Sequence, residues 1–155
     1  MVAYATYLMS HIQFNPLDSL VFLTNRVGRL LANRIRLLSG MENLGMMPHH
    51  MGILVELWAQ DGLRQQDLAV STIKDKATIA RTLDHLEEEN IVVRVPDPAD
   101  KRNKRIYLTH KGKKLHQQIW PHAESVLKEV LEDIEQKDLE TCKKVLEQIY
   151  HKLNQ

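Results

Sequence analysis

The part of the sequence that most constrains the fold is the stretch from residue 97 to residue 112, DPADKRNKRIYLTHKG. Pro96 and Pro98 fix φ and lack a backbone N–H, so strand pairing over Ile91–Val95 must stop there. Pairing can resume over Arg105–Thr109, because apolar and polar residues alternate there with the period of two of a half-buried strand. The stretch therefore predicts a two-stranded hairpin that leads directly into a helix.

The tip and far strand of this hairpin are strongly basic. Between Lys101 and Lys114 there are seven Lys or Arg residues and no Asp or Glu. Residues 124–140, by contrast, contain seven acidic side chains and two lysines. The formal net charge of +1 thus conceals one basic and one acidic region, and the basic one predicts contact with a polyanion.

Length and composition narrow the class of protein. With 155 residues, 43% of them hydrophobic, we expect a single domain over residues 1–155. The single cysteine, Cys142, excludes an internal disulfide and an all-thiolate metal site within one chain. The N-terminal segment lacks a signal-peptide pattern, and no run reaches the ~18 apolar residues that a membrane span needs. We expect a cytoplasmic protein with no membrane partner.

Helical periodicity dominates the two ends of the chain. Apolar residues recur every three or four positions from Leu20 to Leu38, with start signals at residues 18 and 19 and a stop at Gly40. From Pro121 onward the chain is again helical, with a break near residues 136–138. The apolar stripes of residues 18–39 and 121–153 are too long to stand uncovered, which predicts dimerisation helices buried against a second copy of the chain.

The middle of the chain predicts a helix-turn-helix. One helix begins at Pro48, a short one covers residues 65–70, and Asp75 is the N-cap of a third whose inward residues are Ile79, Leu83 and Leu86. Together with the hairpin, these helices make a winged helix-turn-helix DNA-binding region over residues 48–115. The expected fold class is therefore mainly α, with a two-stranded β-wing and N- and C-terminal dimerisation helices.

In such a module the third helix enters the major groove and the wing reaches the adjacent minor groove or backbone. An exposed helix face with small polar residues is by itself typical of any short amphipathic helix, but the basic hairpin that follows favours double-stranded DNA. The residues predicted to contact DNA are Lys76, Thr78, Arg81, Lys101, Arg102 and Lys104. Asp100 is expected to orient Arg102 through a charge-assisted bond.

These residues resemble the multiple antibiotic resistance regulator (MarR) family of bacterial transcription factors, over roughly residues 18–153. The family's wing signature, Asp-x-Arg-x-Lys followed by Leu-Thr and Gly, is present as Asp100, Arg102, Lys104, Leu108, Thr109 and Gly112. The resemblance implies a homodimeric repressor that binds a pseudo-palindromic operator and releases it when a small aromatic compound binds. It places the effector pocket near Leu23, Val27, Met47, His50 and His116. Two features depart from the family pattern: Ile73-Lys74 in the turn and Thr82 at a commonly apolar position.

Other functions fit the sequence less well. Eight histidines suggest a metal sensor, with His49-His50 or His110 and His116 as first candidates, but no pair has the HxxxH spacing, so we expect no metal and no cofactor. Cys142 suggests a redox-responsive regulator, although its apolar stripe favours a buried structural cysteine. A winged-helix module that binds protein instead of DNA is a further alternative. We expect no enzyme, because no nucleophile motif or phosphate loop is present and the run Glu87–Glu89 is typical of a solvated helix end.

Overall fold

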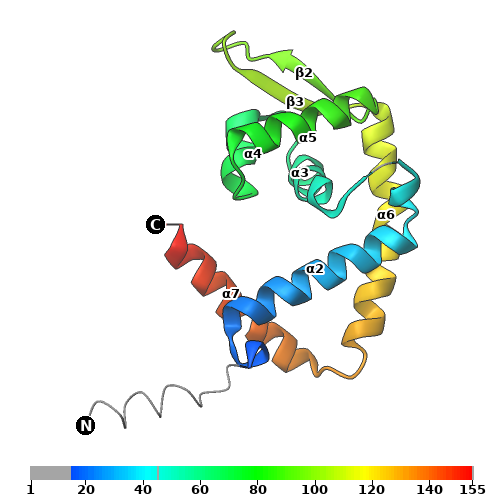
Figure 1. Ribbon diagram of the computed structural model, residues 1–155, viewed down its shortest axis with the longest axis vertical. Helices are drawn as coiled ribbons and strands as arrows, with labels where there is room; N and C mark the ends of the chain where they lie inside the picture. The colour runs from blue at the N-terminus through cyan, green and yellow to red at the C-terminus, as the bar shows by residue number, and fades with distance from the viewer. Residues whose placement is uncertain (1–14, 45, 155) are drawn as a thin grey trace, which may run out of the picture.

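The computed structural model describes residues 15–44 and 46–154. In chain order the elements are η1 (Pro16–Asp18), α2 (Leu20–Leu38), η2 (Met41–Leu44), α3 (Pro48–Ala59), β1 (Leu63–Arg64), α4 (Gln65–Ser71), α5 (Lys76–Glu88), β2 (Val92–Pro96), β3 (Lys104–Leu108), α6 (His110–Leu131) and α7 (Gln136–Leu153), where η denotes a 3₁₀ helix. The predicted fold class, a mainly helical winged helix-turn-helix, is confirmed (Figure 1).

The winged module consists of α3, α4, α5 and a small antiparallel sheet with strand order β1-β3-β2. Arg94 of β2 lies opposite Ile106 of β3, and Leu63 of β1 lies opposite the same isoleucine on its other side. The predicted hairpin is confirmed by β2 and β3. Strand β1 was not predicted, because its two residues are too few to show an alternating pattern.

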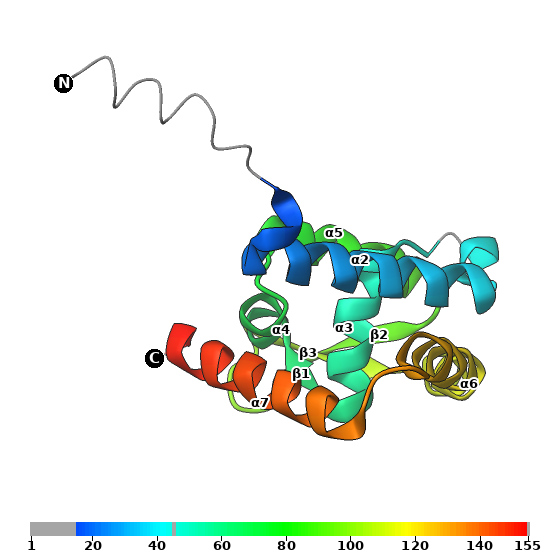
Figure 2. The ribbon, with the colours of Figure 1, turned by 90° about the horizontal axis from the view of Figure 1, so that it is seen from below.

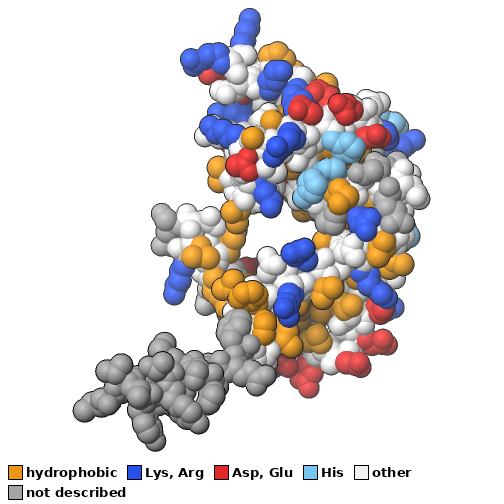
Figure 3. Space-filling view, in the orientation of Figure 1, with side chains coloured by type: hydrophobic (Ala, Val, Ile, Leu, Met, Phe, Trp, Pro, Cys, Tyr) orange, Lys and Arg blue, Asp and Glu red, His pale blue; other side chains and the backbone are white. Residues whose placement is uncertain are grey.

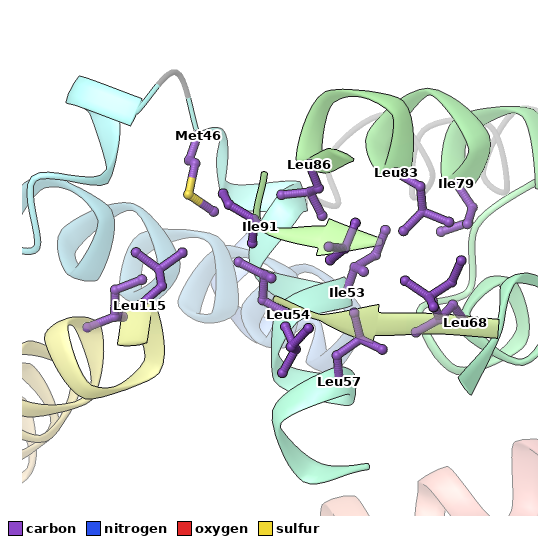
Figure 4. Close-up of a cluster of buried hydrophobic side chains, with 14 of the residues drawn as sticks. Met46, Ile53, Leu54, Leu57, Leu68, Ile79, Leu83, Leu86, Ile91 and Leu115 are labelled. Carbon is purple, nitrogen blue, oxygen red and sulfur yellow. The ribbon is translucent and has the colours of Figure 1, made fainter. Parts of the chain in front are cut away.

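Most of the hydrophobic core lies inside this module, and it extends to Met41 and Met46 before α3 and to Leu115 and Ile119 of α6 (Figure 4). The predicted inward residues of α5, Ile79, Leu83 and Leu86, are all buried, and they meet Ile53 and Leu57 of α3. Burying one such side chain contributes ~1.5–3 kcal/mol. The three helices and the sheet are therefore held together by a shared core, which fixes where α5 and the wing lie.

The turn between α4 and α5 explains how both departures from the family pattern are accommodated. Ile73 adopts φ +53°, the left-handed conformation that glycine takes without cost, and its side chain is 81% exposed. Thr82 is buried, and its hydroxyl donates to the carbonyl oxygen of Thr78 at 2.9 Å. Neither feature disturbs α5, which begins at the expected N-cap Asp75.

The helix that the sequence predicts directly after the hairpin and the helical stretch that it predicts from Pro121 onward form one continuous helix. Helix α6 begins at His110, directly after the wing, and continues through Pro121 to Leu131. The N-cap Thr109 accepts a hydrogen bond from the backbone of Gly112 at 3.1 Å, which starts the helix early. Pro121 removes one backbone donor from a helix that is long enough to continue without it.

Helices α2, α6 and α7 extend from the winged module, and α2 and α7 are separated from each other in the view from below (Figures 1 and 2). Arg34 of α2 pairs with Glu129 of α6 at 2.7 Å. No described residue of α7 is buried. The prediction of a buried Cys142 is therefore wrong for the single chain, because α7 leaves this cysteine exposed. Over the described residues, no helix is both long and apolar enough to cross a membrane.

Candidate nucleic-acid interface

The first turn of α5 is organised by its N-cap. The carboxylate of Asp75 accepts hydrogen bonds from the backbone N–H of Thr78 at 2.8 Å and from the Thr78 hydroxyl at 2.6 Å. Both bonds lower the pKa of Asp75 below its usual value, and the bond from the Thr78 hydroxyl contributes more than the one from the backbone. The carboxylate of the cap therefore stays ionised. The Thr78 hydroxyl oxygen also accepts from Arg81 at 3.3 Å. Because the hydroxyl proton is committed to Asp75, Thr78 presents an acceptor and a methyl group rather than a free donor.

The wing tip presents one arginine in a fixed orientation. The guanidinium of Arg102 donates to the two carboxylate oxygens of Asp100 at 3.0 and 2.9 Å, although 91% of the Arg102 side chain is exposed. This pairing lowers the pKa of Asp100 and raises the pKa of Arg102. The two residues are thus paired as the sequence suggested. That the pairing serves DNA contact stays a prediction.

The base of the wing contains a buried carboxylate that sequence reasoning treated only as a turn former. Asp97, with 4% of its side chain exposed, accepts from the backbone N–H of Ala99 at 3.0 Å and pairs with Arg105 at 3.1 Å. Arg105 also donates to the carbonyl oxygen of Gly62 at 3.2 Å. The hydrogen bond from Ala99 is the largest cause that lowers the pKa of Asp97, and the pairing with Arg105 lowers it further. Burial acts in the opposite direction and raises this pKa. The hairpin is therefore fastened to the turn before β1.

Sequence reasoning also missed Arg94, and it misjudged Glu87. The side chain of Arg94 reaches from β2 to α5, where it pairs with Asp84 at 2.7 Å and with Glu87. Glu87 is therefore not simply part of a solvated helix end. Glu89, from the same run, pairs with Lys111 at 3.5 Å. The missed signal is the i, i+3 spacing of Asp84 and Glu87, which places both carboxylates on one side of α5.

The predicted DNA-contacting residues fall into two groups. Lys76, Thr78 and Arg81 lie in the first turns of α5, and Lys101, Arg102 and Lys104 lie at the tip of the wing and the start of β3. Thr78 is half-buried, and the other five are exposed. Lys76 and Lys101 form no ion pair with the carboxylates that the structure describes. Lys and Arg side chains gather over the wing and over the region of α4 and α5 (Figure 3).

The residues predicted to form an effector pocket are not brought together. A groove of about 1060 Å³ lies between α2 and the winged module, and of the five residues only Met47 lines it. His116 instead lines a hollow of about 320 Å³ beside Trp58. Leu23 and Val27 are exposed on α2, and His50 is buried. The groove carries two cations, Arg29 and Lys74, together with His49 and one carboxylate, Glu56, among a mixture of apolar and polar neighbours.

Three histidine rings, His49 and His50 of α3 and His85 of α5, lie close together at the start of α3. The His50 ring lies 4.3 Å from that of His49 and 4.8 Å from that of His85, between ring centroids. Burial, and secondarily the two neighbouring imidazoles, lower the pKa of His50 to about 4. The Nδ1 atom of His50 accepts from the backbone N–H of Met47 at 3.2 Å. Within residues 15–44 and 46–154, no group of three His, Cys, Asp or Glu side chains is arranged to hold a metal ion.

The helix-turn-helix and its basic hairpin define a winged helix-turn-helix protein, and comparison with known proteins shows which proteins it resembles. The MarR family model matches residues 48–104. The transcriptional regulator HosA of Escherichia coli O111:H- is 37% identical over 70 residues, which are 45% of this chain and 52% of HosA. The chain spans about half the length of the curated relatives that it matches.

Solved structures resemble nearly the whole chain. A MarR family regulator from Rhodococcus sp. RHA1 has a TM-score of 0.73 and 26% identity, covering 85% of this chain and 92% of that one. CouR from Rhodococcus jostii RHA1, bound to p-coumaroyl-CoA, has a TM-score of 0.72 and 26% identity, covering 87% of this chain and 94% of CouR. The chain thus resembles MarR family regulators: the family model matches its winged region, and the solved MarR family structures match its fold along most of its length.

Proposed function

We propose that this protein is a homodimeric transcriptional repressor that binds a pseudo-palindromic DNA operator. The observation that carries the proposal is the pair of cationic surfaces described above, one on the first turns of α5 and one at the wing tip around the oriented Arg102. Helix residues in the major groove would read bases, and the wing lysines would neutralise phosphates. The match of the winged region to the MarR family model supports DNA rather than protein as the partner.

The two surfaces should differ in what they contribute. We would first select a duplex from a randomised library with the native protein, then compare its affinity with that of a random duplex at matched salt. Arg81→Ala should lower the ratio of the two affinities, since one base contact contributes ~1–3 kcal/mol of discrimination. Lys101→Ala should weaken both duplexes alike and reduce the slope of log affinity against log salt by about 0.9. A native protein that selects no sequence would refute the proposal.

A homodimer would cover the apolar faces that a single chain leaves open. On α2, Leu20 and Val21 are exposed, and on α7, Leu146 and Leu153 are exposed. Two copies related by a twofold axis would bury such faces and present two winged modules to two half-sites. Leu146→Asp should therefore abolish dimer formation and tight binding of the selected duplex together, as measured by sedimentation and titration. Glu147→Gln, on the neighbouring position of the same helix, is the matched control and should change neither.

The groove between α2 and the winged module is the proposed effector site. Its apolar wall and the cations Arg29 and Lys74 suit an aromatic acid or its thioester. The structural relative CouR is bound to an aromatic acyl-CoA, which supports this ligand class. A ligand releases DNA only if it binds the non-DNA-binding form more tightly. Aromatic acids and their CoA thioesters should raise the thermal midpoint of the free protein and weaken DNA binding, and Arg29→Gln should reduce both effects. If neither class of compound changes either quantity, no effector of this kind acts here.

A further inference from the structure

Arg94 of strand β2 binds α5 at three points. Helix α5 is the recognition helix, the one proposed to enter the major groove. One guanidinium nitrogen, Nη1, donates to the carboxylate of Glu87. The other, Nη2, donates to Asp84 at 2.7 Å and to the carbonyl oxygen of Ala80 at 3.1 Å. These partners are four and three residues apart, so they follow one side of α5 for two turns. Only 12% of the Arg94 side chain is exposed, whereas Asp84 and Glu87 are 60% and 40% exposed, so the guanidinium is fixed in place while water partly screens its two ion pairs.

The backbone of the same residue is held as well. Strand β2 is at the edge of the sheet, and the backbone N–H of Arg94 donates to Glu87 at 3.1 Å. Both the main chain and the side chain of Arg94 are thus fastened to α5. Further along the hairpin, β2 leads to the wing tip with Arg102, while Ala80 lies between Thr78 and Arg81 on α5. One residue therefore joins the two surfaces proposed to contact DNA.

We propose that Arg94 is a positioning residue that couples the recognition helix to the wing, so that both elements engage DNA as one rigid unit. This inference rests on the proposed DNA-binding function. Without the clamp, the wing could bend independently of α5, and a specific duplex would have to order the two elements separately, at an entropic cost. Non-specific binding through phosphates tolerates such freedom, since it does not depend on a fixed register.

A simpler role for Arg94 is to neutralise Asp84 and Glu87, whose carboxylates would otherwise repel DNA. The two roles predict different outcomes when all three charges are removed together. In the variant Arg94→Met, Asp84→Asn, Glu87→Gln, the repulsion is absent but the clamp is also lost. Selectivity here is the ratio of the affinities for the selected and the random duplex. If this ratio is below the native value in the triple variant, the clamp itself matters. If the ratio equals the native value, the arginine acts by charge alone and our inference is overturned.

The decisive test is a double-mutant cycle between helix and wing, repeated with and without the clamp. Affinity for the selected duplex would be measured for Thr78→Ala, Arg102→Ala and the double variant. With Arg94 present, the two effects should be non-additive by about fivefold or more, the lower end of typical coupling between sites. In the Arg94→Met background they should become additive to within about twofold. Arg105→Met is the matched control, because Arg105 fastens the wing base without touching α5, and it should leave the coupling intact.

The outcomes separate this inference from the proposed function. If the native protein selects no duplex, the proposed function fails, and the inference with it. If the native protein selects a duplex but the cycle is additive with Arg94 present, or stays coupled in Arg94→Met, the inference alone is overturned. Should Arg94→Met not fold, Arg94→Lys keeps the charge but cannot span three partners. Additivity in the Lys variant supports the clamp, and full coupling there contradicts it.

Discussion

Gly112 lies where the wing passes into α6, and it leaves no room for a side chain. A Cβ atom added there would lie 2.2 Å from the carbonyl oxygen of Ile91 and 3.1 Å from a methyl carbon of Leu108. The first contact is with backbone, so no side-chain rotation can relieve it. In addition, the Gly112 carbonyl accepts from the indole of Trp58 at 3.1 Å, which fixes the helix start from the other side. We therefore expect Gly112→Ala to destabilise the protein.

The expected magnitude follows from two opposing terms. Overpacking typically costs ~1–3 kcal/mol, and a clash with backbone belongs at the upper end of that range. Alanine is the better helix former by about 1 kcal/mol, which offsets part of the cost. The free energy of unfolding should thus fall by about 2 kcal/mol, equivalent to a decrease of roughly 4–8 °C in the thermal midpoint.

Gly52→Ala is the matched control for this prediction. A Cβ atom at Gly52, inside α3, would meet only a methyl group of Thr72 at 3.7 Å, an ordinary contact. This variant should gain up to about 1 kcal/mol from helix propensity. Urea unfolding, followed by circular dichroism at one fixed protein concentration, measures both. If Gly112→Ala unfolds at the native urea concentration or higher, the close approach of α6 to Ile91 does not exist in solution.

Three further predictions concern local features of the winged module. Ile73→Gly should raise the free energy of unfolding by about 1 kcal/mol, because it relieves a left-handed β-branched residue whose exposed side chain makes little packing; an unchanged or lower value in urea unfolding would contradict this. Asp75→Ala should lower the free energy of unfolding by about 1 kcal/mol, because the N-cap is lost. Asp75→Asn keeps a side-chain acceptor and should lower the free energy of unfolding by less. The pKa of His50 lies at about 4 in the folded protein, below the usual 6.5, so its contribution to stability is full above pH 6.5 and is lost as the pH falls toward 4. His50→Gln should therefore flatten the pH dependence of the urea midpoint over that range, and an unchanged slope would show that His50 is not responsible.

The fold was largely predictable because its signals are local. Helix periodicity, the N-cap at Asp75 and the proline-bounded hairpin each depend on a few neighbouring residues, and the structure places all three as expected. Helix α6 was divided at Pro121, because proline is more typical of the first turn of a helix than of its interior. The exposure of Cys142 was misjudged because an apolar stripe indicates burial without indicating which chain supplies the partner.

The contacts that organise the candidate interface were harder to predict, because they join residues distant in sequence. The bond from Arg94 to Ala80 spans fourteen positions, and that from Trp58 to Gly112 spans fifty-four. A single sequence shows the charges but not their pairing. The effector residues were misplaced for a related reason: His116 lines the hollow beside Trp58, whereas His50 lies against His49 and His85 and lines neither cavity, and only the packed helices reveal this.

Helix α6 links the two ends of the proposed mechanism. Its first turn is fixed to the wing module through Thr109 and Gly112, and Glu129, near its far end, pairs with Arg34 of α2. A helix of 22 residues is about 33 Å long, so a tilt of about 5° moves one end by roughly 3 Å. The groove lies between α2 and the winged module, so a ligand that widens it would tilt the module against α2. In a dimer the two wings must match half-sites about one DNA turn apart. A displacement of this size at each module is enough to disturb both recognition helices together, provided that each wing moves with its helix, as the Arg94 clamp requires.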